Sequence, residues 1–135
     1  MANSSGVPLA IVHKTRISGE EVQAHRIVGD IQHCAPILVD DMISTGGTIE
    51  TAVKALLAAG CEPDITVVAS HALCVGPATE RLRGLPVQRC IATDSVVGLP
   101  GNPLSLHVVS LDALLATAIR RLHSGLSLGD LIMYD

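Results

Sequence analysis

Residues 37–48 constrain the fold of this chain most, because they join a strand pattern to a helix pattern through a turn of small residues. Residues 37–39 are all apolar, which is typical of a buried parallel strand, and Asp40 and Asp41 follow where that run ends. After Thr48, apolar residues recur at the spacing of one helix face, and Gly60 supplies a helix stop. The sequence therefore predicts a strand, a tight loop and a helix N-terminus in immediate succession.

The loop between this strand and this helix suits a bound anion. It consists of Ser44, Thr45, Gly46, Gly47 and Thr48. Glycines let the backbone approach a ligand closely, and the N–H groups and dipole of a helix start favour negative charge. The hydroxyl groups add further hydrogen-bond donors.

The acidic pair that precedes the loop would repel a phosphate, so we expect it to contact something else. Carboxylates beside a phosphate loop suit ribose hydroxyls, which donate hydrogen bonds, or a divalent cation held partly by substrate oxygens. The combined pattern indicates a sugar phosphate, with its anion on the loop and its sugar over Asp40 and Asp41.

The simplest alternative is a strand-to-helix turn with two solvated aspartates. Two acids, two threonines and two glycines in one turn favour the binding site instead. The loop lacks Gly-Lys-Ser/Thr and Gly-x-Gly-x-x-Gly, so it is neither a Walker loop nor a dinucleotide fingerprint.

The remaining chain alternates strand and helix patterns, which predicts an α/β fold with a doubly wound, mostly parallel sheet flanked by helices. Phenylalanine and tryptophan are absent, so the core must be aliphatic. We expect strands at residues 9–12, 22–30, 64–70, 87–93 and 106–109, and helices at 76–82, 111–122 and 127–133. Ser110 is expected to cap the helix that follows it.

Residues 39–48, Val-Asp-Asp-Met-Ile-Ser-Thr-Gly-Gly-Thr, resemble the phosphoribosyl-pyrophosphate (PRPP) binding motif of type I phosphoribosyltransferases. Within that superfamily, this sequence is most similar to the corresponding motif of the ribose-phosphate diphosphokinases, the enzymes that make PRPP. Ser44 stands where that family most often has an acidic residue. The resemblance implies a phosphoribosyltransferase-like fold, with residues 40, 41 and 44–48 binding ribose-5-phosphate or PRPP.

The segment at residues 9–16 resembles the part of these enzymes that precedes their catalytic flexible loop. Lys14 and Arg16 match the two cations credited there with stabilising the transferring diphosphoryl group, and two cations suit the anionic charge of such a step. The alternative is a solvated pair of basic residues at a strand end. Ile17, Ser18 and Gly19 replace the basic and proline residues that the family usually has next.

Two further segments resemble the family: the strand-end His71 and the run Thr93-Asp94-Ser95. His71 either faces the site or is a capped or core histidine, and the spacing leaves both open.

The resemblance covers residues 9–132, but complete diphosphokinases have two such domains, and this chain resembles the second. We expect a flexible leader at residues 1–8 and one phosphoribosyltransferase-type domain at residues 9–135. The resemblance implies that Mg²⁺ is bound together with the substrate phosphates. It also implies that ATP binds only when a missing N-terminal domain is present, and that the protein forms a homo-oligomer.

Three functions follow from this resemblance. In the first, the chain is the C-terminal domain of a diphosphokinase and is inactive alone. In the second, it is a standalone phosphoribosyltransferase, although no segment supplies the hood that would bind the acceptor. In the third, it is a non-catalytic regulatory partner that binds PRPP or phosphate.

Composition narrows the classes of partner. A net charge of −4 gives no indication of nucleic-acid binding, and no apolar run reaches the roughly 18 residues that span a membrane. No signal-peptide pattern is present, so we expect a cytoplasmic protein. The cysteines lack metal-site spacing and are expected to be free thiols; they are Cys34, Cys61, Cys74 and Cys90.

Overall fold

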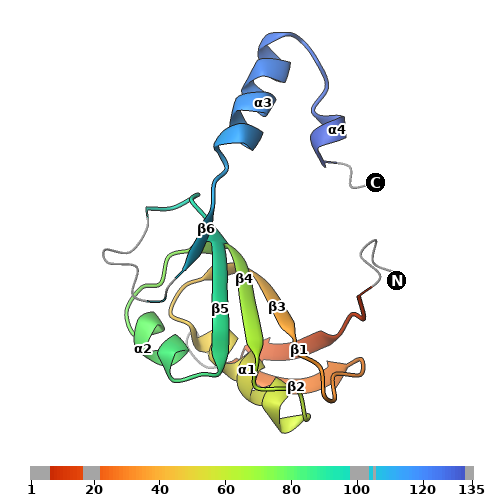
Figure 1. Ribbon diagram of the computed structural model, residues 1–135, viewed down its shortest axis with the longest axis vertical. Coiled ribbons are helices and arrows are strands. Elements are labelled where there is room, and N and C mark those ends of the chain that lie inside the picture. The colour runs from red at the N-terminus through yellow and green to blue at the C-terminus, as the bar shows by residue number, and fades with distance from the viewer. Residues whose placement is uncertain (1–6, 17–21, 98–103, 105, 133–135) are drawn as a thin grey trace.

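A computed structural model describes residues 7–16, 22–97, 104 and 106–132, without the side chains of 14–16, 22–26 and 132. Residues 1–6 of the expected leader therefore lie outside the described residues. The chain forms a small α/β body from which a helical arm projects (Figure 1).

The strands belong to two separate sheets. The antiparallel pair β1–β2 consists of Ile11–Arg16 and Val22–Val28. The second sheet is parallel, with strand order β3-β4-β5-β6, and comprises Ile37–Ile43, Ile65–Ala72, Val87–Thr93 and His107–Val109. The helices are α1 Gly47–Ala58, α2 Ala78–Arg83, α3 Asp112–His123 and α4 Gly129–Ile132. The predicted α/β class with a parallel sheet and helices is confirmed.

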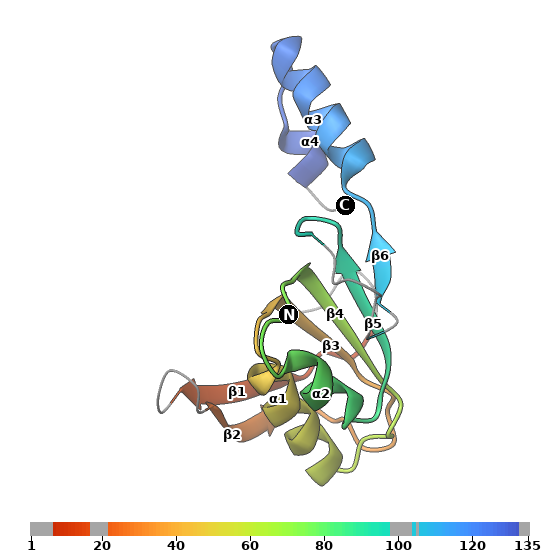
Figure 2. The ribbon, with the colours of Figure 1, turned by 90° about the vertical axis from the view of Figure 1, so that its left-hand side faces the viewer.

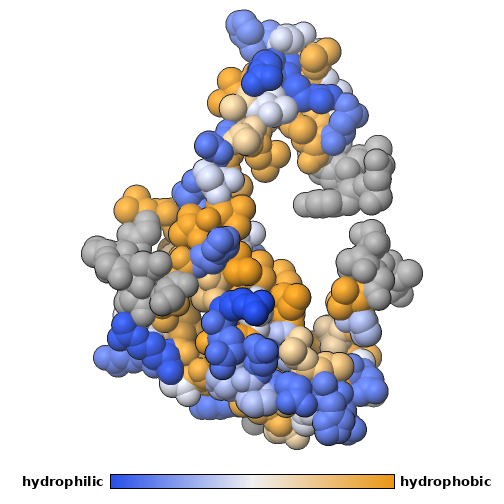
Figure 3. All heavy atoms as spheres, viewed as in Figure 1, coloured by the Kyte–Doolittle hydropathy of each residue, from blue (hydrophilic) through white to orange (hydrophobic). Residues whose placement is uncertain are grey.

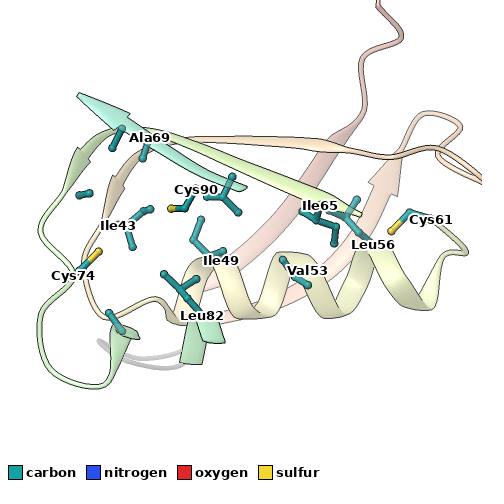
Figure 4. Close-up of a cluster of buried hydrophobic side chains, with 14 of the residues drawn as sticks. Ile43, Ile49, Val53, Leu56, Cys61, Ile65, Ala69, Cys74, Leu82 and Cys90 are labelled. Carbon is teal, nitrogen blue, oxygen red and sulfur yellow. The ribbon is translucent and has the colours of Figure 1, made fainter. Parts of the chain in front are cut away.

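Helices α1 and α2 pack on the same face of the parallel sheet (Figure 2). The core between these layers is aliphatic, as predicted, and includes Ile49 and Val53 of α1 and Ile65 and Val67 of β4 (Figure 4). Residues 65, 67 and 69 of β4 are buried while 66 and 68 are only half-buried, because alternate strand residues point to opposite faces. The β1–β2 pair packs beside α1.

Strands β3 and β1 extend well beyond the apolar runs that predict them. Strand β3 continues through Asp40 and Asp41 to residue 43, although the apolar run ends at residue 39. Strand β1 covers residues 11–16, so the backbone of Lys14 and Arg16 lies within it and not after it. In both cases the ladder of backbone hydrogen bonds extends the strand beyond its apolar residues, since pairing does not depend on side-chain polarity.

Helix α3 does not cover the sheet. It continues from β6 away from the body, and α4 turns back beside it (Figures 1 and 2). None of the described side chains of α3 is buried, although its apolar stripe, predicted from residues 111–122, is present. The opposite face of the parallel sheet therefore remains open to solvent around Ile37 and Val39. None of the described helices is long and apolar enough to cross a membrane.

Candidate functional site

The predicted loop lies at the carboxyl end of β3, where it leads directly into α1. Gly46 is the N-cap and has a left-handed backbone with φ of 78°, a region that glycine adopts without penalty. The Glu50 amide donates to the Gly46 carbonyl (2.9 Å), which forms the first helical hydrogen bond. Among the described residues no side chain caps this helix end. The amides of residues 47–49 are the ones that a helix start leaves without helical partners, so they are available to an anion.

The loop that follows β4 is hydrogen-bonded to the loop that follows β3. The Cys74 amide donates to the Ile43 carbonyl (2.9 Å), and the Val75 amide donates to the Ser44 carbonyl (3.0 Å). Cys74 itself has a positive φ of 47°. These contacts join the loop after β4 to the loop after β3, so the two carboxyl-end loops are held as one unit.

Arg81 of α2 contacts the loop of residues 44–48, a contact that the sequence did not predict. Its Nη1 donates to the Thr45 carbonyl (3.1 Å). Its guanidinium also lies 3.5 Å from the Glu50 carboxylate, between Nε and Oε2. No local pattern could have indicated this contact, because it spans 36 residues and depends on where α2 packs.

Glu50 lies in the first turn of α1 and is paired with cations on both sides. Lys54 Nζ donates to its Oε1 (2.6 Å), one helical turn away. This hydrogen bond lowers the pKa of the Glu50 carboxyl; slight burial opposes the effect, and the charges of Lys54 and Arg81 add to it. Glu50 is thus an ionised partner that orients Arg81 toward the loop.

The two predicted acids do not share one face of the strand. Asp40 is half-buried and pairs in register with Ala69, a core residue, whereas Asp41 is exposed. Consecutive strand residues point to opposite faces, so the carboxylates diverge. Asp40 Oδ1 accepts a hydrogen bond from the Asp41 amide (3.0 Å). Only Asp40 lies on the side of the sheet that carries α1.

Asp40 and Thr48 both line a cavity of about 320 Å³ beside the N-terminus of α1. Its walls come from residues 9–12, residues 37–40 and the first turns of α1. Thr51 adds a third polar group, and its hydroxyl donates to the Gly47 carbonyl (2.9 Å). The rest of the lining is apolar. The cavity therefore offers a mostly apolar wall with a few polar groups next to the helix N-terminus, which suits a small polar ligand.

His71 lies at the same carboxyl edge of the sheet, near the end of β4. Its side chain is exposed and is not part of the core. Its Nδ1 is 2.7 Å from Ser95 Oγ. The hydroxyls of Ser95 and Thr93 donate to the Ser70 carbonyl (3.0 and 2.6 Å). This network ties the ends of β4 and β5 together.

The side chains of Lys14 and Arg16 lie outside the described residues, as do Ile17, Ser18 and Gly19. Their role in transfer stays a prediction. The described residues contain no cluster of three His, Cys, Asp or Glu side chains that could hold a metal ion. A Mg²⁺ ion at this edge would therefore take most of its ligands from substrate oxygens and water, as this ion usually does.

The chain is similar in sequence to proteins of a known family. The family model described as the phosphoribosyl synthetase-associated domain matches residues 8–133. A ribose-phosphate pyrophosphokinase of Streptomyces coelicolor is 41% identical over 118 residues, covering 85% of this chain and 36% of the relative. That of Caldanaerobacter subterraneus subsp. tengcongensis is 37% identical over 132 residues, covering 96% of this chain and 41% of the relative.

A solved structure is also similar: the phosphoribosylpyrophosphate synthetase of Mycobacterium smegmatis. It superposes with a TM-score of 0.75 at 35% identity, over 90% of this chain and 38% of that one. The chain thus spans about two-fifths of the length of the relatives it matches. By sequence and by fold, this chain belongs to the family of the phosphoribosyl synthetase-associated domain and is related to the PRPP synthetases.

Proposed function

We propose that this chain acts as the C-terminal, sugar-phosphate-binding domain of a ribose-phosphate diphosphokinase. In this function residues 44–48 bind the 5-phosphate of ribose-5-phosphate, and the diphosphoryl group comes from ATP. The observation that carries the proposal is the uncapped N-terminus of α1, which begins at a left-handed Gly46 and lies under Arg81.

The phosphate would be held mainly by backbone amides. The first-turn amides of α1 point at it, and the helix dipole adds partial positive charge. The Thr48 hydroxyl, which lines the adjoining cavity, supplies a side-chain donor. Arg81 holds the loop through its contact with the Thr45 carbonyl, and Glu50 shares its charge, so the loop is positioned before the ligand arrives.

The pentose would lie toward the carboxylates. Asp40 borders the same cavity as Thr48, so it is the acid placed to accept hydrogen bonds from ribose hydroxyls. Asp41 is exposed on the opposite side of the strand, which leaves it free to face a substrate oxygen or Mg²⁺ beyond the strand end. When bound, Mg²⁺ would neutralise phosphate charge.

Transfer requires parts beyond this site. We assign Lys14 and Arg16 to the stabilisation of the diphosphoryl group, where cations lower the energy of spread anionic charge. ATP binding is assigned to a separate N-terminal domain, because the chain matches only about two-fifths of its relatives. The chain by itself is then expected to bind ribose-5-phosphate without turning it over.

A second candidate function is a non-catalytic partner of a PRPP synthetase that binds sugar phosphate. The description of the matching family, a domain associated with phosphoribosyl synthetase, favours it. It uses the same phosphate loop and differs only in needing no reaction at Lys14 and Arg16.

Calorimetric titration with ribose-5-phosphate tests the binding site. Thr48→Val removes one donor to the anion and should weaken binding by about 1–3 kcal/mol, or roughly 5- to 150-fold in Kd. Thr117→Val is the matched control, since its hydroxyl donates to the Ala113 carbonyl one turn earlier in α3, away from the cavity. Equal affinity in wild type and Thr48→Val would contradict the placement of the phosphate.

A reconstitution assay separates the two functions. The chain is mixed with the separately expressed N-terminal part of a ribose-phosphate pyrophosphokinase, and formation of AMP from ATP is measured with ribose-5-phosphate present. The diphosphokinase proposal predicts activity that Lys14→Ala abolishes while ribose-5-phosphate binding stays intact. Binding without activity under any mixture would favour the regulatory partner.

A further inference from the structure

Three charged side chains form a group beside the start of α1: Arg81 of α2, and Glu50 and Lys54 of α1. Lys54 Nζ donates to Glu50 Oε1 (2.6 Å), and Arg81 Nε lies 3.5 Å from Glu50 Oε2. One carboxylate therefore faces two cations, and the group keeps an excess of positive charge. Figure 3 shows hydrophilic side chains over α2 and the neighbouring part of α1, the two helices that carry this group.

Arg81 lies where the fold alone does not favour a cation. A Cβ built on Gly47, the first residue of α1, would be 3.4 Å from Arg81 Nη1, so the guanidinium lies against the first turn of the helix. The helix dipole makes this end positive, which favours an anion there and opposes a cation. Glu50 offsets the charge of Arg81 only in part, because Lys54 shares the same carboxylate. The remaining positive charge favours a further anion at this helix end.

The contact between Arg81 and Glu50 is the weaker of the two contacts that Glu50 makes. The two side chains are 38% and 29% exposed, and an ion pair with that exposure contributes little. The Lys54 hydrogen bond is the largest cause of the lowered pKa of Glu50, ahead of the charge of Arg81. A phosphate offers arginine a stronger, charge-assisted pair of parallel hydrogen bonds. Arg81 can therefore change partner at low cost, and Lys54 remains to neutralise Glu50.

We propose that Arg81 exchanges the Glu50 carboxylate for the bound phosphate, so that Glu50 limits the affinity of the site. This inference rests on the proposed sugar-phosphate site and adds a direct ligand and a restraint to it. Before binding, Glu50 holds Arg81 beside the loop; after binding, Arg81 contacts the phosphate. Its hydrogen bond to the Thr45 carbonyl can persist, because a guanidinium carries five donors. Glu50 is thus a positioning residue that acts through Arg81.

Calorimetric titration with ribose-5-phosphate of the wild type, Glu50→Gln, Arg81→Met and the double variant tests the exchange. Glu50→Gln keeps the size of the side chain and removes its charge, so it should tighten binding by about 2- to 5-fold, the strength of an exposed ion pair. A purely structural role for the pair predicts the opposite sign. Arg81→Met should weaken binding by roughly 2- to 10-fold. In the double variant the gain from Glu50→Gln should disappear, because the two residues act as one unit.

Glu80→Gln is the matched control for the loss of a negative charge. Glu80 precedes Arg81 on α2 and is exposed, and among the described side chains it makes no contact with Arg81. Titrations in about 0.15 M salt limit the effect of distant charges, since the screening length is then about 8 Å. The affinity of Glu80→Gln should equal that of the wild type.

The outcomes separate this inference from the function on which it rests. If the wild type does not bind ribose-5-phosphate, the proposed site and the exchange both fail. If the wild type binds and Thr48→Val weakens binding, the site stands, and two results overturn the exchange alone. One is weaker or unchanged binding by Glu50→Gln. The other is an equal gain from Glu50→Gln with and without Arg81, which would show simple repulsion between Glu50 and the phosphate.

Discussion

Gly46 is the residue on which the geometry of the phosphate loop depends most directly, and Gly46→Ala is the perturbation that tests it. The backbone there is left-handed, with φ of 78°, and α2 packs close by. A Cβ added at this position would lie 3.4 Å from the Ala78 Cα and 3.6 Å from its carbonyl oxygen. Both are ordinary van der Waals distances to backbone atoms of α2, so the left-handed φ and not a steric clash sets the cost.

The expected cost has two opposing parts. A non-glycine residue in the left-handed region costs about 1–2 kcal/mol. Alanine also restricts the unfolded chain, which returns about 0.4–1 kcal/mol. We expect Gly46→Ala to lower the free energy of unfolding by about 1 kcal/mol.

Urea denaturation of Gly46→Ala and Gly47→Ala measures this difference. Gly47 is already the first residue of α1, without a positive φ, and its added Cβ would meet two movable side-chain atoms, Arg81 Nη1 at 3.4 Å and Thr45 Oγ1 at 3.8 Å. Since alanine favours a helix over glycine by about 1 kcal/mol, Gly47→Ala should be neutral or slightly stabilising. The midpoints should therefore differ while the slope with urea stays the same.

A third variant checks the physical cause. Asparagine adopts the left-handed region more readily than alanine, so Gly46→Asn should lose less stability than Gly46→Ala. If Gly46→Ala proves as stable as Gly47→Ala, the strained turn at the start of α1 is not what shapes the loop, and the argument for the phosphate site loses its geometric basis.

Three other predictions concern separate parts of the fold. Gly29→Ala should destabilise the chain more than Gly46→Ala in thermal unfolding, because Gly29 has φ of +122° and its Cβ would meet a backbone oxygen at 2.8 Å. Native alkylation followed by mass spectrometry should modify the exposed Cys34 and spare Cys90, whose pKa is raised to about 11 by burial; unfolding should expose both. Arg81→Met should weaken ribose-5-phosphate binding by roughly 2- to 10-fold, the equivalent of one hydrogen bond, while Arg83→Met on the same helix should leave it unchanged.

The central unit of the fold could be predicted from local sequence alone. The apolar run at residues 37–39, the small residues of the loop and the helical spacing after Thr48 each act over a few neighbours, and they agree with one another. The same holds for strands β2, β5 and β6, whose predicted positions match within two residues. The prediction of free cysteines was also confirmed for all four.

Strand lengths were harder to predict because neighbouring strands decide them. Asp40 and Asp41 follow an apolar run and look like a loop, but pairing with β4 keeps them within β3. This pairing places the two acids on opposite faces of the sheet. Of the two, only Asp40 lines a cavity with Thr48, which is why we propose different roles for them.

The sequence by itself determined that this chain forms a tight glycine-containing loop between a parallel strand and a helix, because strand, turn and helix patterns are local. Only the tertiary structure decided that Arg81 of α2 holds the loop and that Asp94 directs α3 away from the sheet. Both contacts join residues 17 to 36 positions apart. Their existence depends on how the elements pack, and a one-dimensional pattern carries no information about that packing.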